Sequence, residues 1–106
     1  TGDNYEKAIQ YVTDALTLEP ANAALHTLLA EVYTLGPLSY ELAAQEYRRA
    51  LEINPYCVST LLGAASLYGL PEKVVMLDEA ITWLEQAIKL DPNNPHLPAG
   101  KSVPAS

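Results

Sequence analysis

The sequence predicts an all-α fold, a solenoid of antiparallel helix pairs, and three observations support this prediction. The first is a repeated proline, because Leu-Glu-Pro ends at Pro20, Ile-Asn-Pro at Pro55 and Leu-Asp-Pro at Pro92, which are 35 and 37 residues apart. The second is a pair of alanines that stand five and twelve residues before each of these prolines. The third is that apolar residues recur at helical spacing between these landmarks.

The alanine pairs indicate helices that are closely packed. Seven residues are about two helical turns, so both alanines of a copy lie on one helix face, where small side chains let a neighbouring helix approach. Each copy is expected to be an amphipathic helix that ends before its proline, since proline cannot continue the hydrogen-bond ladder. The larger apolar residues of the three copies are Ile9, Val12, Leu16 and Leu18; Tyr47, Leu51 and Ile53; and Ile81, Leu84, Ile88 and Leu90.

Two more helices are expected between these three copies, because apolar residues continue at helical spacing and Gly36-Pro37 and Gly69-Leu70-Pro71 follow as stop signals. Their apolar residues are Leu25, Leu28, Leu29, Val32 and Tyr33 in the first, and Leu61, Leu62, Leu67 and Tyr68 in the second. The five expected helices cover residues 4–18, 22–35, 39–53, 57–69 and 74–90.

From about residue 3 to residue 94 the sequence resembles the tetratricopeptide repeat family, whose unit of about 34 residues is a helix, a turn and a helix. His26 stands where the family often has tryptophan. The resemblance implies a right-handed α-solenoid of about two and a half repeats. The other matching positions are Leu29, Ala30, Tyr33, Ala43, Tyr47, Ala50 and Pro55, then Leu61, Ala64, Ala65, Tyr68, Ala80, Leu84, Ala87 and Pro92.

This register divides the chain into four segments. Residues 1–20 are expected to be the second helix of a truncated first repeat, with Thr1 to Tyr5 as the turn before it. Residues 21–55 and 56–92 form two repeats, with longer turns at 36–39 and 69–75, and residues 93–106 form a proline-rich tail or linker. We therefore expect a fragment of a longer solenoid that begins in mid-repeat.

Composition excludes several classes of partner. With 6 basic and 13 acidic residues the net charge is −7, which disfavours nucleic acid and anionic membranes as direct partners. The chain has one cysteine, Cys57, so it forms no internal disulfide, and no charged-then-apolar leader stands at its start. These features favour an intracellular protein of the cytoplasm or nucleus.

No catalytic, cofactor or metal site is predicted. The two histidines, His26 and His96, are 70 residues apart, and no zinc, phosphate-loop or nucleophile motif is present. Cys57 is expected to be a small packing residue at a helix start, and His26 to pack between helices. Acidic pairs such as Asp78-Glu79 and Glu41/Glu46 are expected to face solvent.

A binding groove is predicted from the resemblance, because the first helix of each repeat lines the concave face of such a superhelix. The family's groove positions correspond to Ala24, Thr27, Leu28 and Glu31, and to Ser59, Leu62, Gly63 and Ser66. This face suits an apolar or basic segment such as a helix, with Glu31 meeting a lysine or arginine. It lacks the basic residues with which related clamps hold carboxylate tails. Alternatively, a neighbouring helix of the same protein fills it.

The leading functional hypothesis is a non-catalytic adaptor or scaffold in a larger assembly. The stretch Ala21 to Ala30, with Pro37, Ala43 and Ala50-Leu51, is also similar to a repeat in the seventh subunit of the anaphase-promoting complex. The alternative is an accessory region of a larger enzyme. Self-association through the exposed ends of the solenoid is a further possibility.

Overall fold

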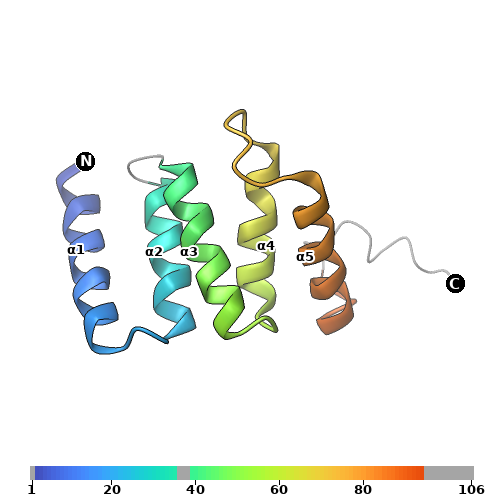
Figure 1. The fold of residues 1–106 in the computed structure, drawn as a ribbon, viewed down its shortest axis with the longest axis horizontal. Helices are drawn as coiled ribbons and strands as arrows, with labels where there is room; N and C mark the ends of the chain where they lie inside the picture. Colours follow the sequence, from blue (N-terminus) through green and yellow to red (C-terminus); the bar gives the residue numbers. More distant parts are fainter. Residues whose placement is uncertain (1, 36–38, 95–106) are drawn as a thin grey trace, which may run out of the picture.

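The computed structural model describes residues 2–35 and 39–94, and within them every regular element is helical (Figure 1). The helices stand side by side in chain order, which confirms the predicted all-α solenoid of paired helices. Their bounds are α1 Gly2–Leu18, α2 Ala23–Leu35, α3 Tyr40–Ile53, α4 Val58–Ser66, the short 3-10 helix η1 Leu67–Gly69, and α5 Leu77–Leu90. The turn predicted at 36–39 lies largely outside the described residues.

The repeated prolines mark the helix ends. Pro20, Pro55 and Pro92 each stand two residues after the last residue of α1, α3 and α5. At the start of α2, the Asn22 side chain accepts hydrogen bonds from the backbone N–H groups of Ala24 and Leu25, at 3.0 and 3.3 Å. It satisfies two donors that lack partners inside the helix.

Two predicted boundaries are wrong. α1 begins at Gly2, so residues 2–5 are helical rather than a turn, and no proline interrupts the backbone ladder there. α5 begins at Leu77 rather than at residue 74, and α4 ends in a 3-10 turn. The reason for the late start is packing, because the connection before α5 buries Val75, which is 2% exposed, and turns at Lys73 with φ of 55°.

Of the alanines predicted for close packing, those of α3 and α5 lie in the core, whereas Ala8 and Ala15 of α1 are only partly buried. Ala43, Ala50 and Ala87 are fully buried and Ala80 is 2% exposed, which confirms their register. The core continues from these alanines through the pairs α2/α3 and α4/α5.

Four of the apolar residues predicted on the packed faces of α1, α3 and α5 are instead exposed. Leu18 is 83% exposed, and Ile53, Ile81 and Leu90 are each about two-fifths exposed. Leu18, Ile53 and Leu90 are the last residues of their helices. Ile81 lies on α5, which stands at one end of the row of helices (Figure 1).

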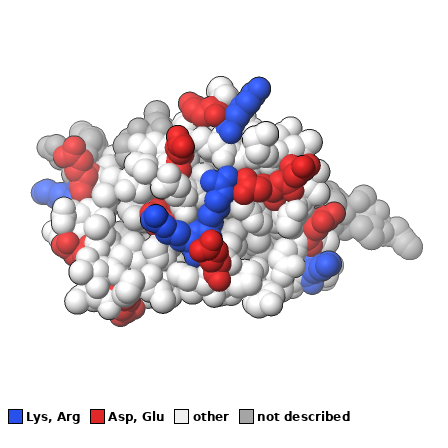
Figure 2. All heavy atoms as spheres, in the orientation of Figure 1, with Lys and Arg blue, Asp and Glu red and all other residues white. Residues whose placement is uncertain are grey.

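Charged side chains connect the helices on the face that Figure 2 shows, where basic and acidic groups gather near the middle, over α3. Arg48 of α3 donates two hydrogen bonds to Glu79 of α5, at 2.7 and 2.9 Å, and one to the backbone oxygen of Val74. These hydrogen bonds from Arg48 hold the pKa of Glu79 below its ordinary value. Glu79 was predicted only to face solvent, so its link to α3 is a correction.

Candidate protein-binding groove

Two hollows lie along the helices α2 and α4, and together we call them the α2–α4 groove. The first, of about 330 Å³, is lined by α2, by the turn before α4 and by the start of α4. The second, of about 270 Å³, is lined by Leu62, Ala65 and Ser66 of α4 and by Leu84 of α5. Seven of the eight predicted groove residues line these hollows: Ala24, Thr27, Leu28, Glu31 and Ser59 in the first, Leu62 and Ser66 in the second.

Gly63 is the eighth predicted residue, and it has a packing role. A Cβ atom built on Gly63 would lie 2.6 Å from the hydroxyl oxygen of Tyr47 and 2.9 Å from its ring. Tyr47 belongs to α3 and is 4% exposed, so the missing side chain lets the ring lie against α4. Gly63 therefore sets the distance between the two repeats.

A pair of hydroxyl groups joins α2 to α4 in the first hollow. Thr27 Oγ1 lies 2.9 Å from Thr60 Oγ1 and also donates to the backbone oxygen of Ala23 at 3.0 Å. Thr60 is 3% exposed, and the sequence analysis did not single it out. Its position one turn inside a helix of small residues contains no signal that distinguishes it from a surface threonine.

Glu31 is the one acidic or basic (Asp, Glu, Lys or Arg) side chain that α2 and α4 contain within their described spans. It is exposed and lines the first hollow. Burial, and secondarily the negative charge of Glu31, raise the pKa of Tyr47 to about 12. Glu31 thus places a single negative charge on an otherwise uncharged lining.

Cys57 also lines the first hollow, at the residue that precedes α4. Its Sγ lies 3.4 Å from Ser59 Oγ, and hydrogen bonds from Ser59 and then Thr60 lower the pKa of the thiol. The residue is only partly buried, so the expectation of a packing residue is met in part. Within the described part of the chain, no group of three or more His, Cys, Asp or Glu residues is placed to hold a metal ion.

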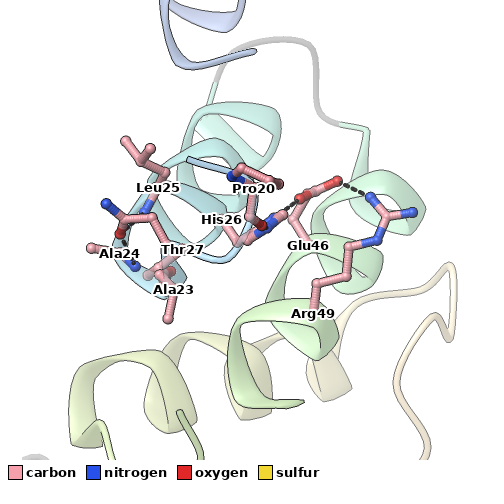
Figure 3. Close-up of polar contacts among 9 residues, drawn as sticks. Pro20, Ala23, Ala24, Leu25, His26, Thr27, Glu46 and Arg49 are labelled. Atoms are coloured by element: carbon pink, nitrogen blue, oxygen red, sulfur yellow. Dashed lines mark hydrogen bonds and ion pairs between the residues drawn. The ribbon is translucent and has the colours of Figure 1, made fainter. Parts of the chain in front are cut away.

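His26 lies outside this groove, in a buried polar network between α2 and α3 (Figure 3). Its Nδ1 lies 2.7 Å from Glu46 Oε1 and its Nε2 lies 2.8 Å from the backbone oxygen of Pro20. Glu46 in turn accepts a hydrogen bond from Arg49 at 2.6 Å. His26 and Glu46 are 8% and 7% exposed, which confirms that His26 packs between helices.

Sequence reasoning missed the partner in this network. Glu46 was grouped with solvated acidic residues, yet it is one of the buried polar groups of the core. The signal that could have identified it is its place between Ala43, Tyr47 and Ala50, all on the packed face of α3.

Comparison with known families agrees with this architecture. Residues 76–94, which include α5 and the turn with Pro92, match the family model described as tetratricopeptide repeat. This segment of the chain is therefore similar to one tetratricopeptide repeat. Repeats of this kind are generally non-catalytic modules that present extended surfaces for binding other proteins.

Several curated relatives are similar over most of this chain. RANBP2-like and GRIP domain-containing proteins 1 and 2 of Homo sapiens are each 34% identical over 91 residues, which is 86% of the chain and 5% of the relative. E3 SUMO-protein ligase RanBP2 of Drosophila melanogaster is 31% identical over 88 residues, 82% of the chain and 3% of that protein. The chain thus spans about a twentieth or less of the relatives it matches.

Neither comparison tests the similarity to the seventh subunit of the anaphase-promoting complex, which stays a prediction. None of the helices in the described residues is both long and apolar enough to span a membrane.

Proposed function

We propose that this tetratricopeptide-repeat chain is a non-catalytic adaptor or scaffold segment that binds a partner protein in the α2–α4 groove. The observation that supports it most directly is the placement of Glu31 in a groove whose two helices hold no other Asp, Glu, Lys or Arg in their described spans. A single charge on an otherwise uncharged surface favours a partner that has the opposite charge at that point. Apolar contacts bind the remainder of the partner's surface.

The chemistry of the groove suggests an apolar helix with one basic residue. Leu28 is 43% exposed and lies on the same helix as Glu31, one turn away. Leu62 lines the neighbouring hollow on α4. An amphipathic helix that places apolar side chains against these leucines and a lysine or arginine against Glu31 satisfies both requirements.

A carboxylate tail is a poor partner for this groove. An anion needs fixed donors, and the corresponding positions hold Thr27, Glu31, Leu62 and Ser66. Glu31 would repel the carboxylate.

The proposal is tested by reversing the charge of Glu31. Basic amphipathic helical peptides and their acidic counterparts are titrated by fluorescence anisotropy against the wild type, Glu31→Lys and Glu41→Lys. Glu41 is exposed in the first turn of α3, so Glu41→Lys makes the same change of net charge outside the groove. We expect Glu31→Lys, but not Glu41→Lys, to weaken the binding of the basic peptides and to strengthen the binding of the acidic ones.

If Glu31→Lys and Glu41→Lys show the same preference between basic and acidic peptides, the net charge of the chain, and not the groove, selects the peptide. Failure of both peptide classes to bind the wild type would favour the alternative in which a neighbouring helix of the intact protein fills the groove.

A second candidate function is an accessory region of a larger enzyme. It is favoured by the Drosophila melanogaster relative, which is named as an E3 SUMO-protein ligase and of which the chain matches 3%. Sequencing the complete reading frame tests it, because a catalytic domain on the same polypeptide supports this candidate and its absence rejects it.

We further propose an intracellular location, in the cytoplasm or nucleus, and self-association through the exposed ends of the helix row. Tyr11 on α1 and Ile81 on α5 are both exposed there. Immunofluorescence of the native protein tests the location, and light scattering over a concentration series tests the self-association.

A further inference from the structure

Another hollow lies away from the α2–α4 groove and is lined by α3, the turn after it, α4 and α5. We call it the Trp83 hollow. Its volume is about 520 Å³, and core leucines, Leu51 and Leu61, line it together with the rings of Pro55, Tyr56 and Trp83. Tyr56 is 66% exposed, and Trp83 is a partly buried residue packed against the core. Two aromatic rings and a proline therefore line an opening to solvent, whose remaining rim is formed by the polar residues Thr82, Glu85, Gln86 and Lys89.

The Trp83 hollow occupies the position that a polar network fills in the preceding repeat. Leu61 stands 35 residues after His26, and Trp83 stands 37 residues after Glu46, which are the two repeat spacings. Gln86 corresponds in the same way to Arg49 and also lines the hollow. In the first pair these positions form hydrogen bonds to one another, whereas in the second pair they leave an apolar depression.

The sequence that follows α5 has the chemistry to fill this depression. Residues 95–98 lie outside the described residues and read Pro-His-Leu-Pro. Two prolines separated by two residues are typical of segments that adopt a polyproline II helix and bind grooves lined by aromatic rings. Such a segment loses little conformational entropy when it binds.

The distances also permit this contact. Lys89, one residue before the end of α5, already lines the hollow. Trp83 stands seven residues before Leu90, which is about 10 Å along the helix at about 1.5 Å per residue. Four extended residues span about 13 Å, so a segment that turns back after Asn94 is long enough to reach the ring.

We propose that residues 95–98 of this chain bind in the Trp83 hollow, with the proline rings against Tyr56 and Trp83 and Leu97 toward the core leucines. Glu85, exposed and among the lining residues, is placed to attract Lys101 further along the segment. The contact covers the apolar surface that the second repeat leaves open. No residue that lines this hollow also lines the α2–α4 groove, and the contact does not depend on the function proposed for that groove.

Trp83 allows a direct test because it is the single tryptophan of the chain. We would measure its emission maximum and acrylamide quenching in the full chain, in the variant P95A/L97S/P98A and in the matched control V103S/P104A. The proposal predicts a red shift and stronger quenching in the first variant, with wild-type values in the control. Circular dichroism checks that helix content is unchanged.

A synthetic peptide of residues 93–100 gives the second measurement. Added to the P95A/L97S/P98A chain, it should reverse the red shift, while the wild type, whose hollow is already filled, should respond weakly. Identical quenching in the wild type and the triple variant would overturn the proposal. So would a wild-type chain that takes up the peptide as readily as the variant, because the hollow would then be open to a partner instead.

Discussion

The helix pairs α2/α3 and α4/α5 have the same alanine register but fill one equivalent position in opposite ways. Between α2 and α3, His26, Glu46 and Arg49 form a hydrogen-bonded network in which His26 and Glu46 are less than 10% exposed. Between α4 and α5, the corresponding Leu61, Trp83 and Gln86 instead line an open hollow. The alanines set the spacing of the helices, whereas the residues at this position decide whether the surface is closed or can bind.

The two solutions differ in their sensitivity to change. A buried polar network is stable only while each member keeps its partners, because an unpaired buried charge is strongly unfavourable. An apolar hollow makes no such demand, but it leaves aromatic surface in contact with water. Four predictions follow this contrast, from the largest expected effect to the smallest.

The largest effect is expected from the shared frame of small residues. Ala50→Arg and Ala87→Arg, one in each pair, should each lower the free energy of unfolding by about 3 kcal/mol or more, since both sites are fully buried and cannot hold a long charged side chain. Urea denaturation followed by circular dichroism measures this. Glu41→Ala on the exposed face of α3 is the control, and a melting temperature equal to that of Ala50→Arg would show that the register is wrong.

The second largest effect is expected from the polar network of His26, Glu46 and Arg49. Glu46→Ala should lower the free energy of unfolding by about 3 kcal/mol, because it leaves His26 and Arg49 without their shared acceptor. The triple change H26L/E46W/R49Q, which installs the residues of the second pair, should stay within about 1 kcal/mol of the wild type, since apolar residues often replace a buried ion pair without loss.

The control is Glu52→Ala, at an exposed acidic residue of the same helix, which should leave the free energy of unfolding nearly unchanged. If the triple variant unfolds more readily than Glu46→Ala, the two pairs are not interchangeable at this position, and the comparison fails.

A smaller effect is expected where the two repeats meet. Gly63→Ala should destabilise the chain by about 1 kcal/mol, because the crowding of the Tyr47 ring exceeds the gain in helix propensity of up to about 1 kcal/mol. The matched change Gly69→Ala meets no atom within 4 Å and should be close to neutral. A stabilised Gly63→Ala variant in thermal melts would show that the ring moves aside freely.

The effect that is smallest at neutral pH concerns the ionisation of Tyr47, which changes stability only above about pH 10. The pKa of Tyr47 is raised to about 12, so the folded state holds this proton more tightly than the unfolded chain, whose tyrosines ionise near about pH 10. The resulting stability is fully present below about pH 10 and is lost as the pH rises through 12. Between about pH 10 and about pH 12, the free energy of unfolding should therefore fall more in the wild type than in Tyr47→Phe.

The effect of Glu31 on the same hydroxyl can be measured separately. Glu31→Gln removes the charge that contributes to the shift and should lower the pKa of Tyr47 in an absorbance titration of the phenolate. An unchanged titration would leave burial as the whole cause.

Much of the fold followed from the sequence because it depends on local rules. Helix periodicity, the prolines after α1, α3 and α5 and the buried alanines involve residues a few positions apart, so spacing alone predicts them. The helix bounds were less accurate at α1 and α5. The late start of α5 depends on the burial of Val75, which is a tertiary contact.

The sequence placed the candidate groove residues on one face but did not predict the contacts among them, and their binding role stays a proposal. Seven of the eight positions line the two hollows because the resemblance to the repeat family places them on one face. The pairing of Thr27 with Thr60 joins residues 33 positions apart, and the contact of Tyr47 with Gly63 joins different repeats. Such contacts depend on how the helices pack and have no local signature.

The sequence by itself determined that this chain is helical, repeated and closely packed through alanines, because these properties arise from periodic spacing within single helices. The tertiary structure alone decided that Glu46 is buried against His26 while Trp83, at the equivalent position, borders an open hollow. The physical reason is that burial depends on which side chains other helices bring to the same place. In one repeat those side chains complete a hydrogen-bonded network, and in the next they leave apolar surface uncovered.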